Sequence, residues 1–139
     1  MTKKMNNKGF SLVELIIVIA IMAVLIGVLA PQFIKYVERS RNSTDIQNAE
    51  EIRDALQAYH VDTMRSTDNL ATSGSVAVGT GAPTINGAGV GVALSDAGIA
   101  DVKCKSKQSW STYTVSYSMT GDNLTFTYSP SAFATAMGK

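Results

Sequence analysis

The most uneven feature of the sequence is a continuous apolar stretch near its start. Residues 10–30 are apolar except for Ser11 and Glu14. As a helix this stretch would be about 31 Å long, which matches the hydrocarbon thickness of a bilayer. Residues 1–9 are polar and contain three basic side chains and no acid: Lys3, Lys4 and Lys8. By the positive-inside rule, the pattern predicts a membrane-inserted helix with its N-terminal end in the cytoplasm and the bulk of the chain outside.

Two simpler kinds of N-terminal segment fit part of this pattern. A cleaved secretory signal peptide has a shorter apolar core; Val28-Leu29-Ala30 could serve as its cleavage site, but Pro31 would follow the cut bond and should block cleavage. A plain membrane anchor gives no reason for Glu14, because a carboxylate near the centre of an apolar span costs about 2.5–3.5 kcal/mol. The structural alternative is that Glu14 extends to the membrane surface from a shallow depth.

A periodic pattern of apolar residues follows the continuous apolar stretch, in residues 31–64, and predicts that the helix continues. Apolar side chains recur there at spacings of three and four, which indicates one buried stripe on an amphipathic helix: Ile46, Ala49, Ile52, Leu56 and Tyr59. We therefore expect a single helix from about Phe10 to about Met64. The charged residues near its middle are expected to form a mixed, solvated face: Lys35, Glu38, Arg39 and Arg41.

Residues 65–139 have a different composition and are expected to form a loop followed by a small sheet. Residues 69–91 are rich in Gly, Ala, Ser and Thr, which predicts a loop with a short strand at residues 75–79. Residues 93–97 are expected to form a helical turn, with a strand as the alternative. A further strand is expected near residues 102–104.

The clearest β signal lies near the C-terminus. Residues 113–119 and 124–128 each alternate between apolar and hydroxyl-bearing side chains, and the segment between them, which includes Gly121 and Asp122, has good turn chemistry. The apolar face of this hairpin is expected to cover the helix stripe. The predicted fold class is α+β, with a long N-terminal α-helix packed against a small antiparallel β-sheet.

Composition narrows the classes of function. The formal net charge is +1, so no overall field indicates a nucleic-acid partner. Cys104 is the single cysteine and His60 the single histidine, so one chain can form neither an internal disulfide nor a Cys/His-rich zinc site. Cys104 and Trp110 are expected to be packing residues, and His60 a solvated or hydrogen-bonded one. Because no nucleophile–base pair or cofactor motif is recognisable, we predict neither an enzyme nor a cofactor.

The N-terminal string as a whole resembles a known family. Residues 8–14, Lys-Gly-Phe-Ser-Leu-Val-Glu, followed by the apolar block and then by Pro31, closely resemble the N-terminus of type IV pilins and pseudopilins. The resemblance covers about the first third of the chain. It implies a leader peptide (residues 1–9), a transmembrane and filament-core helix (10–30), its amphipathic continuation (31–64) and a globular head (65–139).

The resemblance also implies a role for particular residues. A prepilin peptidase would cleave between Gly9 and Phe10 and methylate the new amino group of Phe10. Glu14 would pair with the N-terminal amine of Phe10 of a neighbouring subunit during assembly. The stretch that contains Gly27 and Pro31 would lose helical order on assembly, a neutral kink being the alternative.

The leading functional hypothesis is a structural subunit of a type IV pilus (fimbrium). The alternatives are a pseudopilin of a type II secretion or DNA-uptake system and a membrane-anchored extracellular binding module. The implied partners are further copies of the chain, a prepilin peptidase, a pilus assembly ATPase and a membrane platform protein, with nucleic acid left open. The chain would lie in the cell membrane before assembly and in an extracellular pilus afterwards, where it could serve adhesion, motility or DNA uptake.

Overall fold

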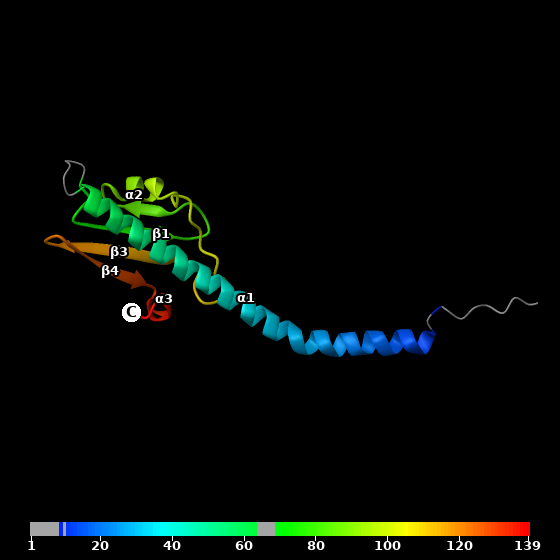
Figure 1. The fold of residues 1–139 in the computed structure, drawn as a ribbon. Helices are drawn as coiled ribbons and strands as arrows, with labels where there is room; N and C mark the ends of the chain where they lie inside the picture. Colours follow the sequence, from blue (N-terminus) through cyan, green and yellow to red (C-terminus); the bar gives the residue numbers. More distant parts are fainter. Residues whose placement is uncertain (1–8, 10, 64–68) are drawn as a thin grey trace, which may run out of the picture. The chain divides into compact units, whose positions relative to one another are not determined.

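A computed structural model describes Gly9, residues 11–63 and residues 69–139 (Figure 1). The chain divides into two compact units, Met1–Val37 and Glu38–Lys139. Helix α1, Leu12–Thr63, contributes residues to both of them. This helix agrees with the single long helix that the apolar stretch and the periodic pattern predict, and its predicted limits, Phe10 and Met64, lie outside the described residues.

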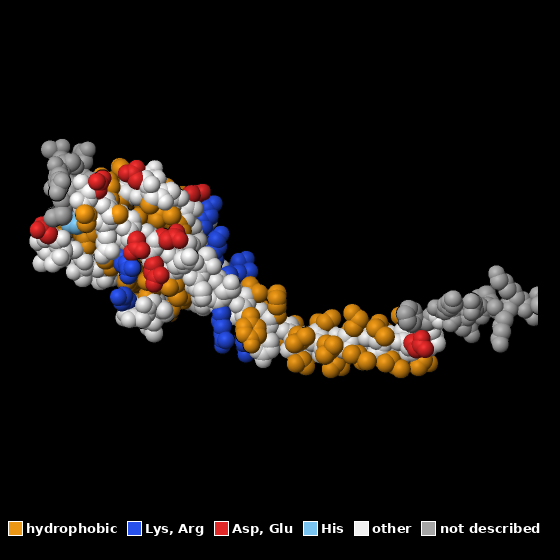
Figure 2. Space-filling model, in the orientation of Figure 1, with side chains coloured by type: hydrophobic (Ala, Val, Ile, Leu, Met, Phe, Trp, Pro, Cys, Tyr) orange, Lys and Arg blue, Asp and Glu red, His pale blue; other side chains and the backbone are white. Residues whose placement is uncertain are grey.

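The first unit consists, in its described part, of the apolar half of α1. Its large apolar side chains from Leu12 to Tyr36 are between 48% and 73% exposed, so none of them is buried within the described part of this unit. In the space-filling view, hydrophobic side chains cover most of this stretch (Figure 2). Among the described residues, α1 is the helix long and apolar enough to cross a membrane by length and composition.

The second unit contains a four-stranded antiparallel sheet with the strand order β2-β1-β3-β4 (Figure 1). The strands are β1 (Ser73–Val78), β2 (Thr84–Asn86), β3 (Tyr113–Thr120) and β4 (Asn123–Ser129). Two short helices complete the unit, α2 (Val90–Asp96) and α3 (Ser131–Ala136). The architecture is therefore the predicted α+β fold, a long helix with a small antiparallel sheet.

The core of the second unit forms between the predicted helix stripe and the sheet. Ala49, Ile52 and Leu56 of α1 are buried in the same cluster as the inward-facing side chains of β1 and β3. Tyr113 and Val115, which alternate with hydroxyl-bearing residues, are fully buried there. The alternation of β3 thus faces its apolar side to the core, as period-two patterning requires.

The predicted C-terminal hairpin is confirmed. Strands β3 and β4 pair through Met119 with Leu124 and through Thr120 with Asn123, which leaves a two-residue turn. Gly121, the first turn residue, has a φ of 63°, a conformation that residues with a Cβ rarely adopt. The short strand predicted at residues 75–79 is present as β1, and the helical turn predicted at residues 93–97 overlaps α2.

The strand predicted near residues 102–104 is wrong. That segment is irregular, and in it the Cys104 N–H donates to the carbonyl of Gly79 at 2.8 Å. The backbone N–H groups that follow donate to helix carboxylates instead of to another strand, so no ladder forms. Strand β2 and helix α3 were not predicted from the sequence.

Glycine 74 offers a test of the sheet packing. A Cβ there would lie 2.6 Å from the carbonyl oxygen of Asn86 and 2.8 Å from the ring of Tyr117, so Gly74→Ala must displace backbone. We expect it to lower the free energy of unfolding by about 1–3 kcal/mol. The measurement is denaturant unfolding of the full-length protein in detergent, followed by the fluorescence of Trp110.

Gly91→Ala is the matched control, because Gly91 lies in α2 and an added Cβ would meet nothing within 4 Å. It should leave stability unchanged or raise it by up to about 1 kcal/mol through helix propensity. Equal effects of the two substitutions would contradict the packing described for β1.

Candidate functional site

The start of α1 is organised by a reciprocal pair of hydrogen bonds. The backbone N–H of Glu14 donates to the Ser11 hydroxyl at 3.3 Å, and the backbone N–H of Ser11 donates to the Glu14 carboxylate at 3.4 Å. The Ser11 carbonyl also accepts the first helical bond, from the N–H of Leu15 at 3.1 Å. Ser11 is thus the N-cap of α1, and Ser11 with Glu14 forms a capping box.

The capping box was not predicted, although its Ser-x-x-Glu spacing is visible in the sequence. It gives Glu14 a partner within its own chain. The carboxylate also lies in the first turn of the helix, where the helix dipole favours negative charge. Glu14 therefore has a local structural role whether or not it also has one in assembly.

The predicted cleavage position lies just before this cap. Gly9 is exposed, and an added Cβ there would meet nothing within 4 Å. Phe10, on which the predictions of cleavage, methylation and amine pairing depend, lies outside the described residues. Gly9 and Glu14 are therefore described by the structure, and the role predicted for Phe10 stays a prediction.

Gly27 and Pro31 lie inside α1, which is helical across both. Proline has no N–H, so the carbonyl of Gly27, four residues earlier, has no helical hydrogen-bond donor, and the proline ring faces that same carbonyl. A Cβ added at Gly27 would meet nothing within 4 Å outside the helix's own backbone, so no neighbouring side chain requires glycine there. The chain shows no break here; the predicted loss of helical order concerns the assembled filament, which a single chain does not test.

In the second unit, a buried carboxylate on α1 binds a distant loop. Asp45 is fully buried and accepts hydrogen bonds from the N–H of Lys105 at 2.7 Å, the N–H of Ser106 at 2.8 Å and the indole Nε1–H of Trp110 at 2.8 Å. The Cys104 thiol also donates to it, at 3.3 Å. Because the aspartate has four donors, its burial is compensated.

Glu38 binds the next part of the same loop. Its carboxylate accepts bonds from the Ser106 hydroxyl and from the backbone N–H groups of Lys107 at 3.1 Å, Gln108 at 2.9 Å and Ser109 at 3.2 Å. Burial by itself would raise the pKa of Glu38, but these hydrogen bonds outweigh it and lower that pKa from 4.5 to about 2. Glu38 is therefore held as a carboxylate.

Glu38 was predicted to lie on a solvated face, which is wrong, since the residue is only 6% exposed. Glu38 and Asp45 are seven residues apart, two helical turns, so they share one face of α1. That face continues the apolar stripe of Ala49 and Ile52. An acid in register with a buried stripe was the available signal that these carboxylates are buried.

We call Glu38, Asp45 and the loop of residues 104–110 the carboxylate clamp. It joins parts of the chain about 60–70 residues apart without a disulfide, and its hydrogen bonds occupy the loop N–H groups that would otherwise be buried without acceptors. Burial, together with the hydrogen bond to Asp45, raises the pKa of the Cys104 thiol to about 12. The buried Cys104 side chain belongs to the hydrophobic core cluster, as expected for a packing residue.

The other residues considered from the sequence also have structural partners. Trp110 is buried with its ring edge against Phe133, at 5.0 Å between ring centroids, as expected for a packing residue. The His60 Nε2 lies 3.1 Å from the carbonyl oxygen of Asp122 in the β3–β4 turn, which fits the expected hydrogen-bonded histidine. No group of three or more metal-ligating side chains occurs among the described residues.

Comparison with known proteins points to the N-terminal segment. A family described as the prokaryotic N-terminal methylation motif matches residues 4–30. Over 63 residues, 45% of this chain, the sequence is 36% identical to the type IV major pilin protein PilA of Myxococcus xanthus (strain DK1622) and covers 29% of that protein. Over 65 residues, 47% of this chain, it is 34% identical to a type IV major fimbrial protein FimA of Dichelobacter nodosus and covers 42% of it.

The chain thus spans less than half the length of these relatives. No solved structure matches it.

The lowered pKa of Glu38 predicts how stability depends on pH. A carboxyl group whose pKa is lower in the folded than in the unfolded chain stabilises the fold at any pH above its unfolded pKa. The contribution of Glu38 should therefore be complete above pH 4.5 and be lost as the pH falls to about 2. Glu38→Gln should therefore be less stable than the wild type at pH 7, by up to about 3 kcal/mol. The difference should shrink towards pH 2.

Denaturant unfolding of both proteins from pH 7 to pH 2 measures this difference. Glu51→Gln, at an exposed carboxylate on the same helix, is the matched control and should follow the wild type at every pH. A deficit of Glu38→Gln that stayed constant across the range would show that the charge of Glu38 does not contribute.

Proposed function

We propose that this chain, which belongs to the type IV pilin family, is a structural subunit of a type IV pilus. The observation that carries the proposal is the joining of two features in one segment. The methylation motif matches residues 4–30, and the large apolar side chains of the helix that begins within it are exposed along the whole apolar stretch. An apolar surface of that extent needs lipid or other subunits around it.

Processing would begin at the cytoplasmic end of this helix. A prepilin peptidase would cut between Gly9 and Phe10, removing residues 1–9 as the leader, and would methylate the amine of Phe10. Gly9 supports this step because it has no side chain and lies exposed before the helix cap, where the backbone can be approached closely. The cap at Ser11 would remain intact after the cut.

In the filament, Glu14 would pair with the N-terminal amine of Phe10 of a neighbouring subunit. A carboxylate surrounded by packed apolar helices is costly when unpaired, and a cation beside it lowers that cost. Subunits out of register would bury an unpaired charge, so Glu14 would select the correct axial alignment. This exchange replaces the weak, 3.4 Å capping bond from Ser11 with a charged partner.

The middle of the apolar helix would change on assembly. The Gly27 carbonyl has no helical donor because Pro31 lacks an N–H, and Gly27 is itself a poor helix former. This is consequently the place where α1 loses least by unwinding. Local unwinding would let a subunit lengthen and fit its neighbours while residues 31–64 stay attached to the head.

The remaining parts of the proposal concern location and partners. Before assembly the helix would cross the cell membrane with its N-terminus in the cytoplasm; afterwards the subunit would lie in a pilus on the cell surface. The partners would be further copies of the chain, the prepilin peptidase, a pilus assembly ATPase and a membrane platform protein. The role would be structural and not enzymatic.

Intact mass and N-terminal sequencing of material sheared from the cell surface test the proposal. We expect a chain that starts at Phe10, carries one added methyl group and is recovered in the sheared fraction. The membrane fraction of the same cells is the control and should contain the precursor. A chain that starts at Met1 and is confined to membranes would overturn the proposal in favour of an anchored binding module.

Two substitutions separate the assembly role of Glu14 from its role in the helix cap. Glu14→Gln keeps a side chain that can complete the capping box but removes the charge. Ser11→Ala breaks the capping box and leaves the charge. If the charge sets the register, Glu14→Gln should lower the yield of sheared filaments by about tenfold or more, and Ser11→Ala should have little effect.

The yield of sheared filaments relative to total subunit in the cell is the measurement, since it corrects for expression. The opposite order of effects would assign Glu14 to the helix cap alone. Normal assembly of both variants would sink the pairing of Glu14 with the neighbouring amine.

A further inference from the structure

The second unit carries three exposed lysines at alternate positions of a loop whose backbone is held by hydrogen bonds. In residues 103–107 the side chains of Lys103, Lys105 and Lys107 are exposed, and those of the two intervening residues are buried. We call this segment the lysine loop. The carboxylate clamp holds the backbone of the lysine loop, because Asp45 accepts a hydrogen bond from the N–H of Lys105 and Glu38 accepts one from the N–H of Lys107. The three ammonium groups are thus presented outward from a fixed backbone, which reduces the entropy lost on binding.

These lysines form no ion pair with an acidic side chain of the described residues. In the part that the structure describes, the ion pairs join Arg41 to Glu38 and Arg53 to Asp54, and none involves the lysine loop. Asp101, the nearest acid along the chain, lines a hollow together with Lys103 and Lys105 but forms no ion pair with them. The positive charge of the loop is left for an external partner.

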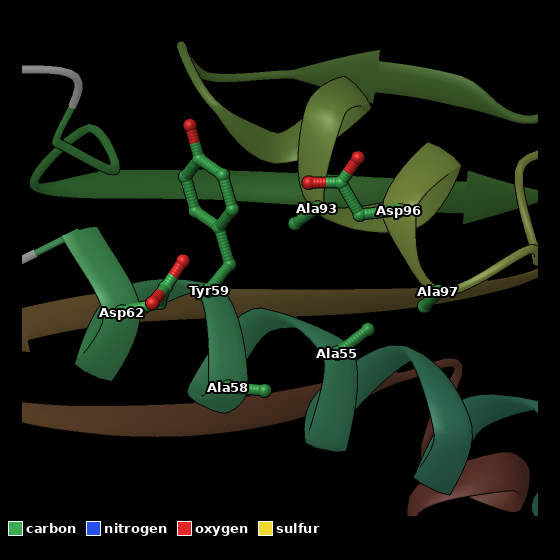
Figure 3. A pocket seen from close by; sticks show the side chains of 7 residues that line it. All are labelled: Ala55, Ala58, Tyr59, Asp62, Ala93, Asp96 and Ala97. Atoms are coloured by element: carbon green, nitrogen blue, oxygen red, sulfur yellow. The ribbon is translucent and has the colours of Figure 1, made fainter.

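A groove elsewhere in the same unit has the opposite chemistry (Figure 3). It lies between α1 and α2, has a volume of about 280 Å³, and its apolar part consists of four alanines: Ala55, Ala58, Ala93 and Ala97. The ring of Tyr59 forms a wall, and carboxylates from both helices stand at the rim, Asp62 from α1 and Asp96 from α2. We call these seven residues the acid-rimmed groove.

The groove fits a long basic side chain better than an apolar one. The alanines offer an apolar surface for the methylene stem of a lysine, and the two aspartates can meet its ammonium group at the rim. Neither Asp62 nor Asp96 forms an ion pair with another described residue. The Tyr59 ring adds an aromatic surface that favours a cation.

Charge separation within one chain identifies the partner. The chain is nearly neutral as a whole, with 12 basic and 11 acidic residues. The carboxylates of Glu38 and Asp45 beneath the lysine loop are buried, so the exposed charged side chains of residues 103–107 are all basic, and those of the groove are acidic. In the view of Figure 2 several Lys and Arg side chains lie near one another with an acidic side chain beside them, and other acidic side chains are spread over the surface. A second copy of the chain would carry a surface complementary to each of these two.

We propose that the lysine loop of one subunit docks on the acid-rimmed groove of the next, with a lysine stem on the alanines and its ammonium group between Asp62 and Asp96. The two surfaces are different parts of the chain, so the contact is heterologous. Repeated heterologous contacts generate an open helical filament unless they close into a ring. The inference rests on the proposed pilin function. It adds a contact between the globular parts of successive subunits, which fixes how each subunit is placed against the next.

Charge reversal tests the contact in cells that express the full-length chain. Reversing the loop (Lys103→Glu, Lys105→Glu and Lys107→Glu) or the groove (Asp62→Lys and Asp96→Lys) should each lower the yield of sheared filaments by about tenfold, because like charges then face each other. Combining all five substitutions should restore the yield to within about twofold of the wild type. Restoration also shows that the variants fold.

The matched control is the pair Glu50→Lys and Glu51→Lys, which makes the same change of charge at exposed positions of α1 outside the groove. It should leave the yield unchanged. A combined variant no better than either reversal would overturn the inference. If reversal of the loop reduced the filament yield and reversal of the groove did not, the inference would also be overturned. The lysines would then be assigned to another anion, such as a lipid headgroup.

A cross-link separates this inference from the proposed function. Two tagged copies, one with Lys105→Cys and one with Asp96→Cys, are expressed together and treated on whole cells with a short bis-maleimide. We expect a mixed dimer from this pair and none from chains that contain only the buried Cys104. Absence of filaments from wild-type cells would refute the proposed function; absence of the mixed dimer would refute the docking contact.

Discussion

The carboxylates of Glu38 and Asp45 are buried charges, and the folded unit around them is arranged to supply their hydrogen-bond donors. If the loop of residues 104–110 moved away from α1, its hydrogen bonds to both carboxylates would be lost, and such charge-assisted bonds are stronger than neutral ones. The same loop positions Trp110 against Phe133 of α3 and directs the lysines outward. One set of charged hydrogen bonds therefore supports the core, the C-terminal helix and the proposed docking surface.

Helix α1 meets two kinds of surroundings along one continuous backbone. From Glu38 onward its stripe is covered by the sheet, whereas before Val37 its apolar side chains are uncovered. Burial of apolar area contributes roughly 25 cal/mol per Å², so the uncovered stretch favours lipid or identical helices strongly over water. Membrane insertion and the proposed assembly into a filament would each cover this apolar surface, so one segment would serve both steps.

The apolar half of α1 is capped at its start and lacks a helical hydrogen bond near its middle. The capping box of Ser11 and Glu14 satisfies donors at the helix start, while Pro31 leaves the Gly27 carbonyl without its helical donor. Assembly that depends on Glu14 must exchange a local partner for one on another chain. Because the local bond is long, at 3.4 Å, the exchange sacrifices little.

The sequence by itself determined the elements whose signals are local: the long helix from its apolar block and its three-four stripe, the hairpin of β3 and β4 from its alternation and turn, and the N-terminal motif. Its Ser-x-x-Glu cap was equally local and was overlooked. Only the tertiary structure decided that Glu38 is buried, that residues 102–104 form no strand, and that Thr84–Asn86 pairs with β1. The physical reason is sequence distance: the donors to Glu38 and Asp45 lie about 60–70 residues away, and a three-residue strand exists only through its neighbour.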